Sequence, residues 1–224
     1  MKYLKKFENH SQYDAYISGG GAVLPNVSLC VQENEVHYNP YVDPYNGHEY
    51  VDLGLPSGTK WATMNVGANS VTDYGNYYDY GKGAATYQET SGTSKYDGIE
   101  NPLALSADTA AQVWGGAWHM PTSAQCQELI SNTYSVWEEN YEGSGINGYL
   151  FIKGSGRLFI PASGYYDSNF NGLIGINVYG ITLTSTPYDS DYIYSLNTES
   201  GDRSIAHAFR RSNGGAGSVR PVVG

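Results

Sequence analysis

Two short apolar runs joined by a tight glycine turn constrain the fold of this chain most. The runs are "GYLFIKG" (148–154) and "GRLFIPASGYY" (156–166), and they meet at Gly-Ser-Gly. Apolar runs of this length, bounded by glycine, are typical of buried strands, and two in succession predict an antiparallel hairpin. The 28 Gly and 22 Tyr among 224 residues extend this prediction to many short strands joined by Gly-rich turns.

Helices are expected at two places. In "MPTSAQCQELISNTY" (120–134), Thr122 and Gln125 form a T-x-x-Q capping box, and the residues Cys126, Leu129 and Ile130 give one apolar face. In "SADTAAQVWG" (106–115) we expect a short helix capped by Ser106 and ended by Gly115. Strand, tight turn and strand are expected in "EYVDLGLPSGTKWATMNVG" (49–67). The pattern predicts an α+β, loop-rich fold of antiparallel strands with one or two helices.

The first 47 residues differ from the rest and are predicted to form a small separate module. Helical spacing of Leu4, Phe7, Tyr13 and Ile17 is followed by "NVSLCV" and "EVHYNP", which flank a polar turn as in a hairpin. Its position suggests attachment or oligomerisation. Residues 48–224 then form the main domain.

The charge balance limits the partners. A net charge of −10 is poorly suited to a nucleic-acid backbone or an anionic membrane surface. No apolar run has the length of a membrane span or of a secretory signal core. We therefore expect no nucleic-acid partner, no membrane insertion and synthesis in the cytoplasm without a cleaved signal.

The catalytic and metal-binding patterns in the sequence are weak. The five histidines are far apart without metal-ligand spacing, and His119 is expected to be structural. Asp189 and Asp191 could share a strand face, but the segment around them is more typical of a turn. No phosphate-binding loop or G-x-S-x-G elbow is present, and Cys30 and Cys126 are expected to be free, buried thiols. We predict no catalytic residues, no metal site and no cofactor.

The C-terminal third lacks five residue types almost completely. Lys, Glu, Gln, Met and Trp occur thirty times in residues 1–153 but once in residues 154–224, at Glu199. At the earlier rate about 14 would be expected. These are the only amino acids with no codon ending in a pyrimidine, so a codon AAC or AAT whose two adenines become any base reaches none of them. One hypothesis is codon diversification of this kind; the alternative is a Tyr/Ser/Gly-rich β region without it.

Tyr, Ser, Gly and Asn also dominate evolved binding loops, where Tyr supplies rigid contact area and the small residues supply adaptable hydrogen bonds. Diversification benefits recognition rather than a catalytic constellation that must be held precisely. Composition and codon pattern together favour a binding surface.

Four segments carry a resemblance to a known family: "EYVDLGLPSGTKWATMNVGA" (49–68), "WHMPTSAQCQELI" (118–130), "LFIPASGYY" (158–166) and "SVRPV" (218–222). They resemble the C-type-lectin-like domain, related to formylglycine-generating enzymes, of gut-bacterial surface and phage proteins. Together with the codon pattern, the chain resembles the variable proteins of diversity-generating retroelements. Residues 1–47 resemble a short module at the start of phage structural proteins. Where the family often has Trp-Ser-Ser-Thr this chain has "LTST" (183–186), and the calcium motifs of animal lectins are absent.

The resemblance implies a receptor-binding protein with a diversified C-terminal surface, located on a phage tail or a cell surface. Its partners would be a cell-surface protein or glycan and, through residues 1–47, other tail proteins; a homotrimer is a further expectation. Two alternatives remain open: a bacterial adhesin of the same fold without diversification, and an enzyme of the formylglycine-generating type.

The variable region is expected at about 175–217, with its exposed residues on the C-terminal strands and loops. The members expected to face a ligand are Tyr179, Ile181, Leu183, Tyr188, Asp189, Tyr192, Tyr194, Asn197, His207, Phe209, Arg210, Ser212 and Asn213. Ile181, Leu183 and Phe209 could instead belong to the core. Ile193, Leu196 and Arg220 are expected to be structural.

Overall fold

The computed structural model describes residues 28–32, 35–39, 45–84, 100–167, 169–210 and 215–224, with backbone only at 28–32, 35–39 and 206–210. The chain separates into two compact units, Met1–Tyr50 and Val51–Gly224. In the first, β1 (Ser28–Gln32) pairs antiparallel with β2 (Glu35–Asn39), which confirms the predicted hairpin. The helix expected near the N-terminus lies outside the described residues.

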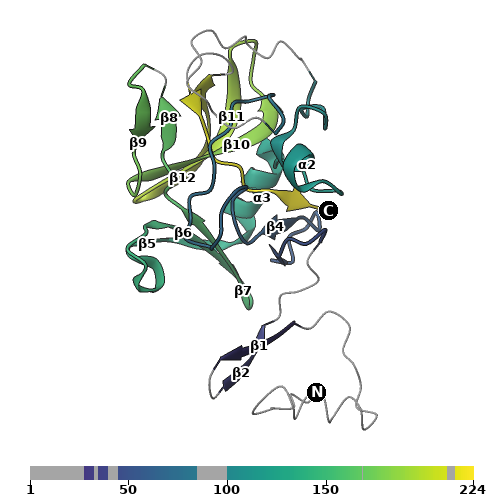
Figure 1. The fold of residues 1–224 in the computed structure, drawn as a ribbon, viewed down its shortest axis with the longest axis vertical. Coiled ribbons are helices and arrows are strands. Elements are labelled where there is room, and N and C mark those ends of the chain that lie inside the picture. Colours follow the sequence, from purple (N-terminus) through teal and green to yellow (C-terminus); the bar gives the residue numbers. More distant parts are fainter. Residues whose placement is uncertain (1–27, 33–34, 40–44, 85–99, 168, 211–214) are drawn as a thin grey trace. The chain divides into compact units, whose positions relative to one another are not determined.

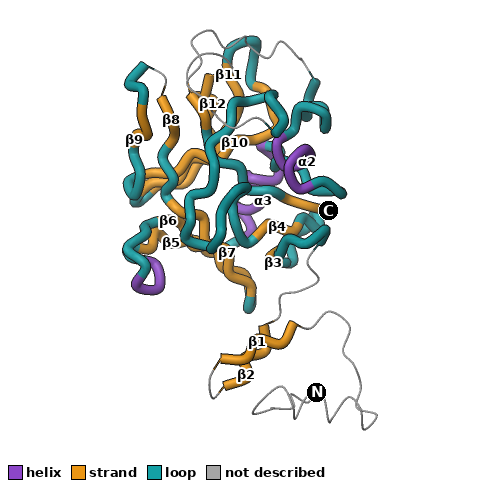
Figure 2. Tube along the Cα trace, viewed as in Figure 1, coloured by secondary structure: helices purple, strands orange, loops and turns teal. Residues whose placement is uncertain are grey.

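The second unit is mostly antiparallel β-structure with two short helices and many loops (Figures 1 and 2). Its described strands form four three-stranded sheets with the orders β14-β4-β3, β5-β6-β7, β13-β8-β9 and β10-β11-β12. The class is therefore the loop-rich α+β arrangement expected from the sequence. No helix in the described part of the chain is long and apolar enough to cross a membrane.

The strand bounds show how short most elements are. The short strands are β3 (Tyr50–Val51), β4 (Lys60–Ala62), β5 (Tyr134–Glu138), β8 (Tyr165–Asp167), β9 (Gly172–Ile174), β13 (Gly215–Ala216) and β14 (Val222–Val223). The long strands are β6 (Gly148–Lys153), β7 (Gly156–Pro161), β10 (Tyr179–Pro187), β11 (Tyr192–Glu199) and β12 (Asp202–Arg210). Strands β6 and β7 are the predicted buried hairpin, with Leu150 opposite Phe159.

Helix α3 (Ser123–Asn132) begins as the sequence predicts. Thr122 accepts a hydrogen bond from the backbone of Gln125, and the Gln125 side chain accepts one from the backbone of Thr122. This capping box satisfies two N–H groups that the helix leaves free. Cys126 and Leu129 are buried, and α3 packs against β6 and the β10-β11-β12 sheet.

Helix α2 (Thr109–Trp114) ends at Gly115 as predicted, but Ser106 is not its cap. Asp108 takes that position and accepts from the backbone N–H of Ala111. The Asp108 carboxylate also accepts from the backbone N–H of Met120, twelve residues away.

The C-terminal segment ties several sheets together. Val222 pairs with Trp61 in β4, and Gly217 exchanges hydrogen bonds with Tyr78. The fully buried Arg220 donates to the carbonyls of Ala62 and Phe159, each at 3.1 Å. The structural role expected for Arg220 is confirmed.

Candidate ligand-binding surface

Most of the predicted contact residues belong to one sheet. Tyr179 and Ile181 lie on β10, Asn197 lies on β11, and the register places Tyr179 opposite Glu199 and Ile181 opposite Asn197. On the other side of β11, Asn197 lies opposite Ser204 on β12. Directly paired residues share a face of a sheet, so these side chains occupy one side of it.

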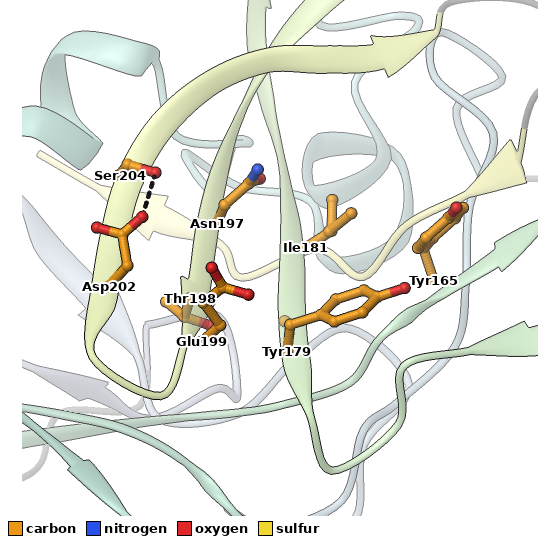
Figure 3. Close-up of a pocket in the computed structure, with 9 residues that line it drawn as sticks. Tyr165, Tyr179, Ile181, Asn197, Thr198, Glu199, Asp202 and Ser204 are labelled. Carbon is orange, nitrogen blue, oxygen red and sulfur yellow. Dashed lines mark hydrogen bonds between the residues drawn. The ribbon is translucent and has the colours of Figure 1, made fainter.

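A cavity of about 260 Å³ lies at these residues (Figure 3). Its lining consists of Tyr165, Tyr179, Gly180, Ile181, Asn197, Thr198, Glu199, Asp202 and Ser204. The two tyrosine side chains lie on one side of the cavity, and Asp202 and Ser204 lie on the other. Three predicted residues, Tyr179, Ile181 and Asn197, are thus brought together.

The aromatic side of the cavity is held by local packing. The Tyr179 ring lies over Gly175, where a Cβ atom would come within 2.1 Å of the ring. The centroids of the Tyr165 and Tyr179 rings are 6.2 Å apart at 34°. Burial, with the Asp167 carboxylate as a further cause, raises the pKa of both hydroxyls above 10.0, so both are neutral donors at physiological pH.

A second group of predicted residues lies at the other end of β11. The Tyr188 and Tyr194 rings meet edge to face, with centroids 5.4 Å apart. Asp189 accepts from the backbone N–H groups of Asp191 and Tyr192, which confirms that the two aspartates lie in a turn.

The two groups do not form one patch. The register shifts around β11 insert extra residues into β10 and β12, so β11 itself remains regular. Side chains alternate along a regular strand, which places Tyr192 and Tyr194 on the opposite face from Asn197. The predicted residues on β10 and β11 therefore lie on two sides of the sheet, with Tyr179, Ile181 and Asn197 on one side and Tyr192 and Tyr194 on the other.

Leu183 was predicted to face a ligand, but the structure places it in the core. It is 0 % exposed, and it packs against Gly217, where a Cβ atom would lie 2.6 Å from Leu183 Cδ2. The C-terminal segment pairs alongside β10 through Thr182 and Ser218 and covers this position. Leu183 is a core residue rather than an exposed contact.

The remaining predicted residues are either buried in the core or lie outside the part of the chain that the structure describes. Ile193 and Leu196 are fully buried, as expected for core positions. The side chains of His207, Phe209 and Arg210 and the whole of Ser212 and Asn213 lie outside the described residues.

Tyr165, Glu199, Asp202 and Ser204 line the cavity but were not identified from the sequence. Glu199 was noted only as the exception to the missing residue types. The Ser200-Gly201 pair could have indicated a two-residue hairpin turn, which would have placed Glu199 opposite Asp202.

A second cavity of about 410 Å³ lies near α2 and α3 and includes Asp108 and His119 among its lining residues. Asp108 is 1 % exposed and serves as the α2 cap. Burial raises the pKa of Asp108, while hydrogen bonds from Ala111 and Met120 act in the opposite direction. His119 Nδ1 lies 2.9 Å from the Met120 carbonyl oxygen, and the backbone of His119 pairs with Val222. Both residues have structural contacts that account for them.

Metal binding and thiol chemistry are two further possibilities for the described residues. No group of three or more His, Cys, Asp or Glu side chains among them could hold a metal ion. Cys126 is free and fully buried, and burial raises the pKa of its thiol. Buried thiols of raised pKa are poor nucleophiles.

Comparison with known proteins gave no family model, no curated relative and no solved structure that matches this chain.

Proposed function

We propose that this chain is a ligand-binding protein of the C-type-lectin-like fold whose C-terminal surface is diversified to recognise receptors, carried on a phage tail. A cell-surface protein or glycan would be its ligand. Residues 1–47 would attach it to other tail proteins, and a homotrimer is the expected assembly.

One observation carries the proposal. The C-terminal third lacks five residue types apart from Glu199, and within it Tyr179, Ile181 and Asn197 lie together at a cavity on one face of the β10-β11-β12 sheet. All three are types that a diversified AAC or AAT codon produces. Their neighbours Leu183, Ile193 and Leu196 are fully buried and suited to hold the sheet in place while the face varies.

The nature of the cavity also supports binding. Concave sites with apolar and aromatic walls and a few polar groups are the usual form of ligand sites. Tyrosine supplies stiff contact area at low entropic cost, and asparagine and serine supply adaptable hydrogen bonds. All three residue types line this cavity.

The DNA around the gene tests the proposal. We expect a nearby near-copy of the segment that encodes residues 175–217, differing from it only at adenines, together with a reverse transcriptase gene. Absence of both would contradict diversification and leave an adhesin with a fixed surface as the better account.

A further inference from the structure

The cavity on the β10-β11-β12 sheet carries negative charge without a compensating cation. Two of its nine lining residues, Glu199 and Asp202, are carboxylates, and none is Lys, Arg or His. Arg203, the basic residue nearest in sequence, lies on β12 directly opposite Thr198 of β11. Its guanidinium carbon is 6.0 Å from the centroid of the Tyr149 ring. The cavity therefore disfavours an anionic ligand.

The two carboxylates are directly opposite each other across the β11–β12 turn. Both side chains are exposed, and the only hydrogen bond to them from a described residue runs from Ser204 Oγ to Asp202 Oδ2 at 3.3 Å. Like charges directly opposite on neighbouring strands destabilise a hairpin. A cation bound between them would relieve this repulsion.

The opposite side of the cavity is also suited to a cation. Tyr165 and Tyr179 present two aromatic rings, and the faces of such rings attract ammonium and guanidinium groups. Thr198 pairs with Gly180 and Arg203, so its buried side chain lies on the other face of the sheet and takes no part in binding the cation.

We propose that this cavity binds a protonated amine, held by the carboxylates of Glu199 and Asp202 and by the rings of Tyr165 and Tyr179. The inference rests on the proposed function, because it takes this cavity as part of the ligand-binding surface. A volume of about 260 Å³ is smaller than a typical drug-sized site, so it accommodates one side chain or one sugar ring. The amine is either that of an amino sugar or that of a lysine side chain.

Glu199 keeps the preference for a protonated amine the same in every variant of the surface. It is the one residue in 154–224 that codon diversification of the AAC or AAT kind cannot produce. Tyr179, Ile181 and Asn197 can vary around it. The fixed carboxylate then selects the chemical class of the ligand, and the variable neighbours select the particular ligand.

The test is a titration of the full-length protein, followed by the amide resonances of residues 179–204. The probes are glucosamine and Nα-acetyl-lysine methylamide, added to roughly 20 mM, the range of a weak single contact. Their neutral counterparts, N-acetylglucosamine and the Nα,Nε-diacetyl lysine derivative, are added in parallel. We expect saturable shifts with at least one amine and roughly tenfold weaker binding of its neutral counterpart.

The variant Glu199→Gln should weaken amine binding roughly tenfold, and Asp202→Asn should do the same. Glu139→Gln is the matched control, because Glu139 is an exposed glutamate that does not line the cavity. No variant should lower the melting temperature, since the substituted side chains are exposed and the loss of Glu199 or Asp202 removes a like-charge repulsion.

If only one of the two amines binds, it identifies the natural ligand group as either an amino sugar or a lysine side chain. The proposal is overturned if neither amine shifts these resonances, if the neutral counterparts bind equally well, or if Glu139→Gln weakens binding as much as Glu199→Gln. These results are independent of the DNA test. A missing near-copy with tight amine binding rejects diversification alone, and a near-copy without amine binding rejects the amine site alone.

Discussion

Leu183 lies directly on Gly217: a Cβ atom built on residue 217 would be 2.6 Å from Leu183 Cδ2. Glycine at 217 lets the C-terminal segment approach β10 closely enough to cover Leu183 completely. This contact separates the buried middle of the sheet from the open cavity formed farther along β10 and β11.

Gly217→Ala should therefore destabilise the fold. The new methyl group would overlap the Leu183 side chain, and overpacking of this kind costs about 1–3 kcal/mol. Chemical denaturation measures the loss of unfolding free energy. Gly172→Ala is the control, because a Cβ atom there would have its nearest neighbour at 3.8 Å and no strained backbone angle. Equal stability of the two variants would show that Leu183 is not packed as described.

Arg220→Lys should also destabilise the protein although it keeps the positive charge. The Arg220 guanidinium reaches two carbonyl groups on different strands, those of Ala62 and Phe159. A single ammonium group cannot reproduce this fork, and each buried carbonyl left unsatisfied costs roughly 1–3 kcal/mol. Thermal and urea unfolding would record the change. The exposed Arg157→Lys should have little effect, and a similar loss in both variants would argue against a special role for Arg220.

Asp108 should make stability depend on pH in a defined direction. Burial raises the pKa of Asp108 in the folded state above its ordinary value of 3.8. A raised folded-state pKa contributes stability that is fully present below 3.8 and is lost as the pH rises through the folded-state pKa. Asp108→Asn retains a capping oxygen without a titrating proton.

The unfolding free energy of the wild type relative to Asp108→Asn should accordingly fall as the pH rises from 3.8 toward neutrality. Urea denaturation of both proteins across this range measures the difference. A difference that is constant, or that grows with pH, would show that the Asp108 carboxylate is not disfavoured by burial.

Local patterns predicted the parts of the fold that depend on local interactions. The capping box of Thr122 and Gln125, the β6–β7 hairpin and the β1–β2 hairpin follow from neighbouring residues, so sequence alone was enough. The cap of α2 was placed at Ser106 instead of Asp108, because Ser and Asp are both favoured N-cap residues and the local pattern does not choose between them.

The site was harder to predict for the same reason. Tyr179, Ile181 and Leu183 alternate along one strand, so the sequence predicted that all three face a ligand, but burial of Leu183 depends on Gly217, 34 positions later. The register shifts beside β11 likewise decide which tyrosines share a face with the cavity. Tyr165 comes from a different sheet and joins the site only through the tertiary fold.

We propose that the outward face of the C-terminal strands varies among isolates while its supporting residues do not. Comparison of the coding region among independent isolates tests this proposal. We expect substitutions to concentrate in the first two bases of pyrimidine-ending codons at cavity-lining positions such as Tyr179 and Asn197, and to spare Leu183 and Glu199. Substitutions spread evenly along the gene, or as frequent at Leu183 and Glu199 as at Tyr179, would contradict it.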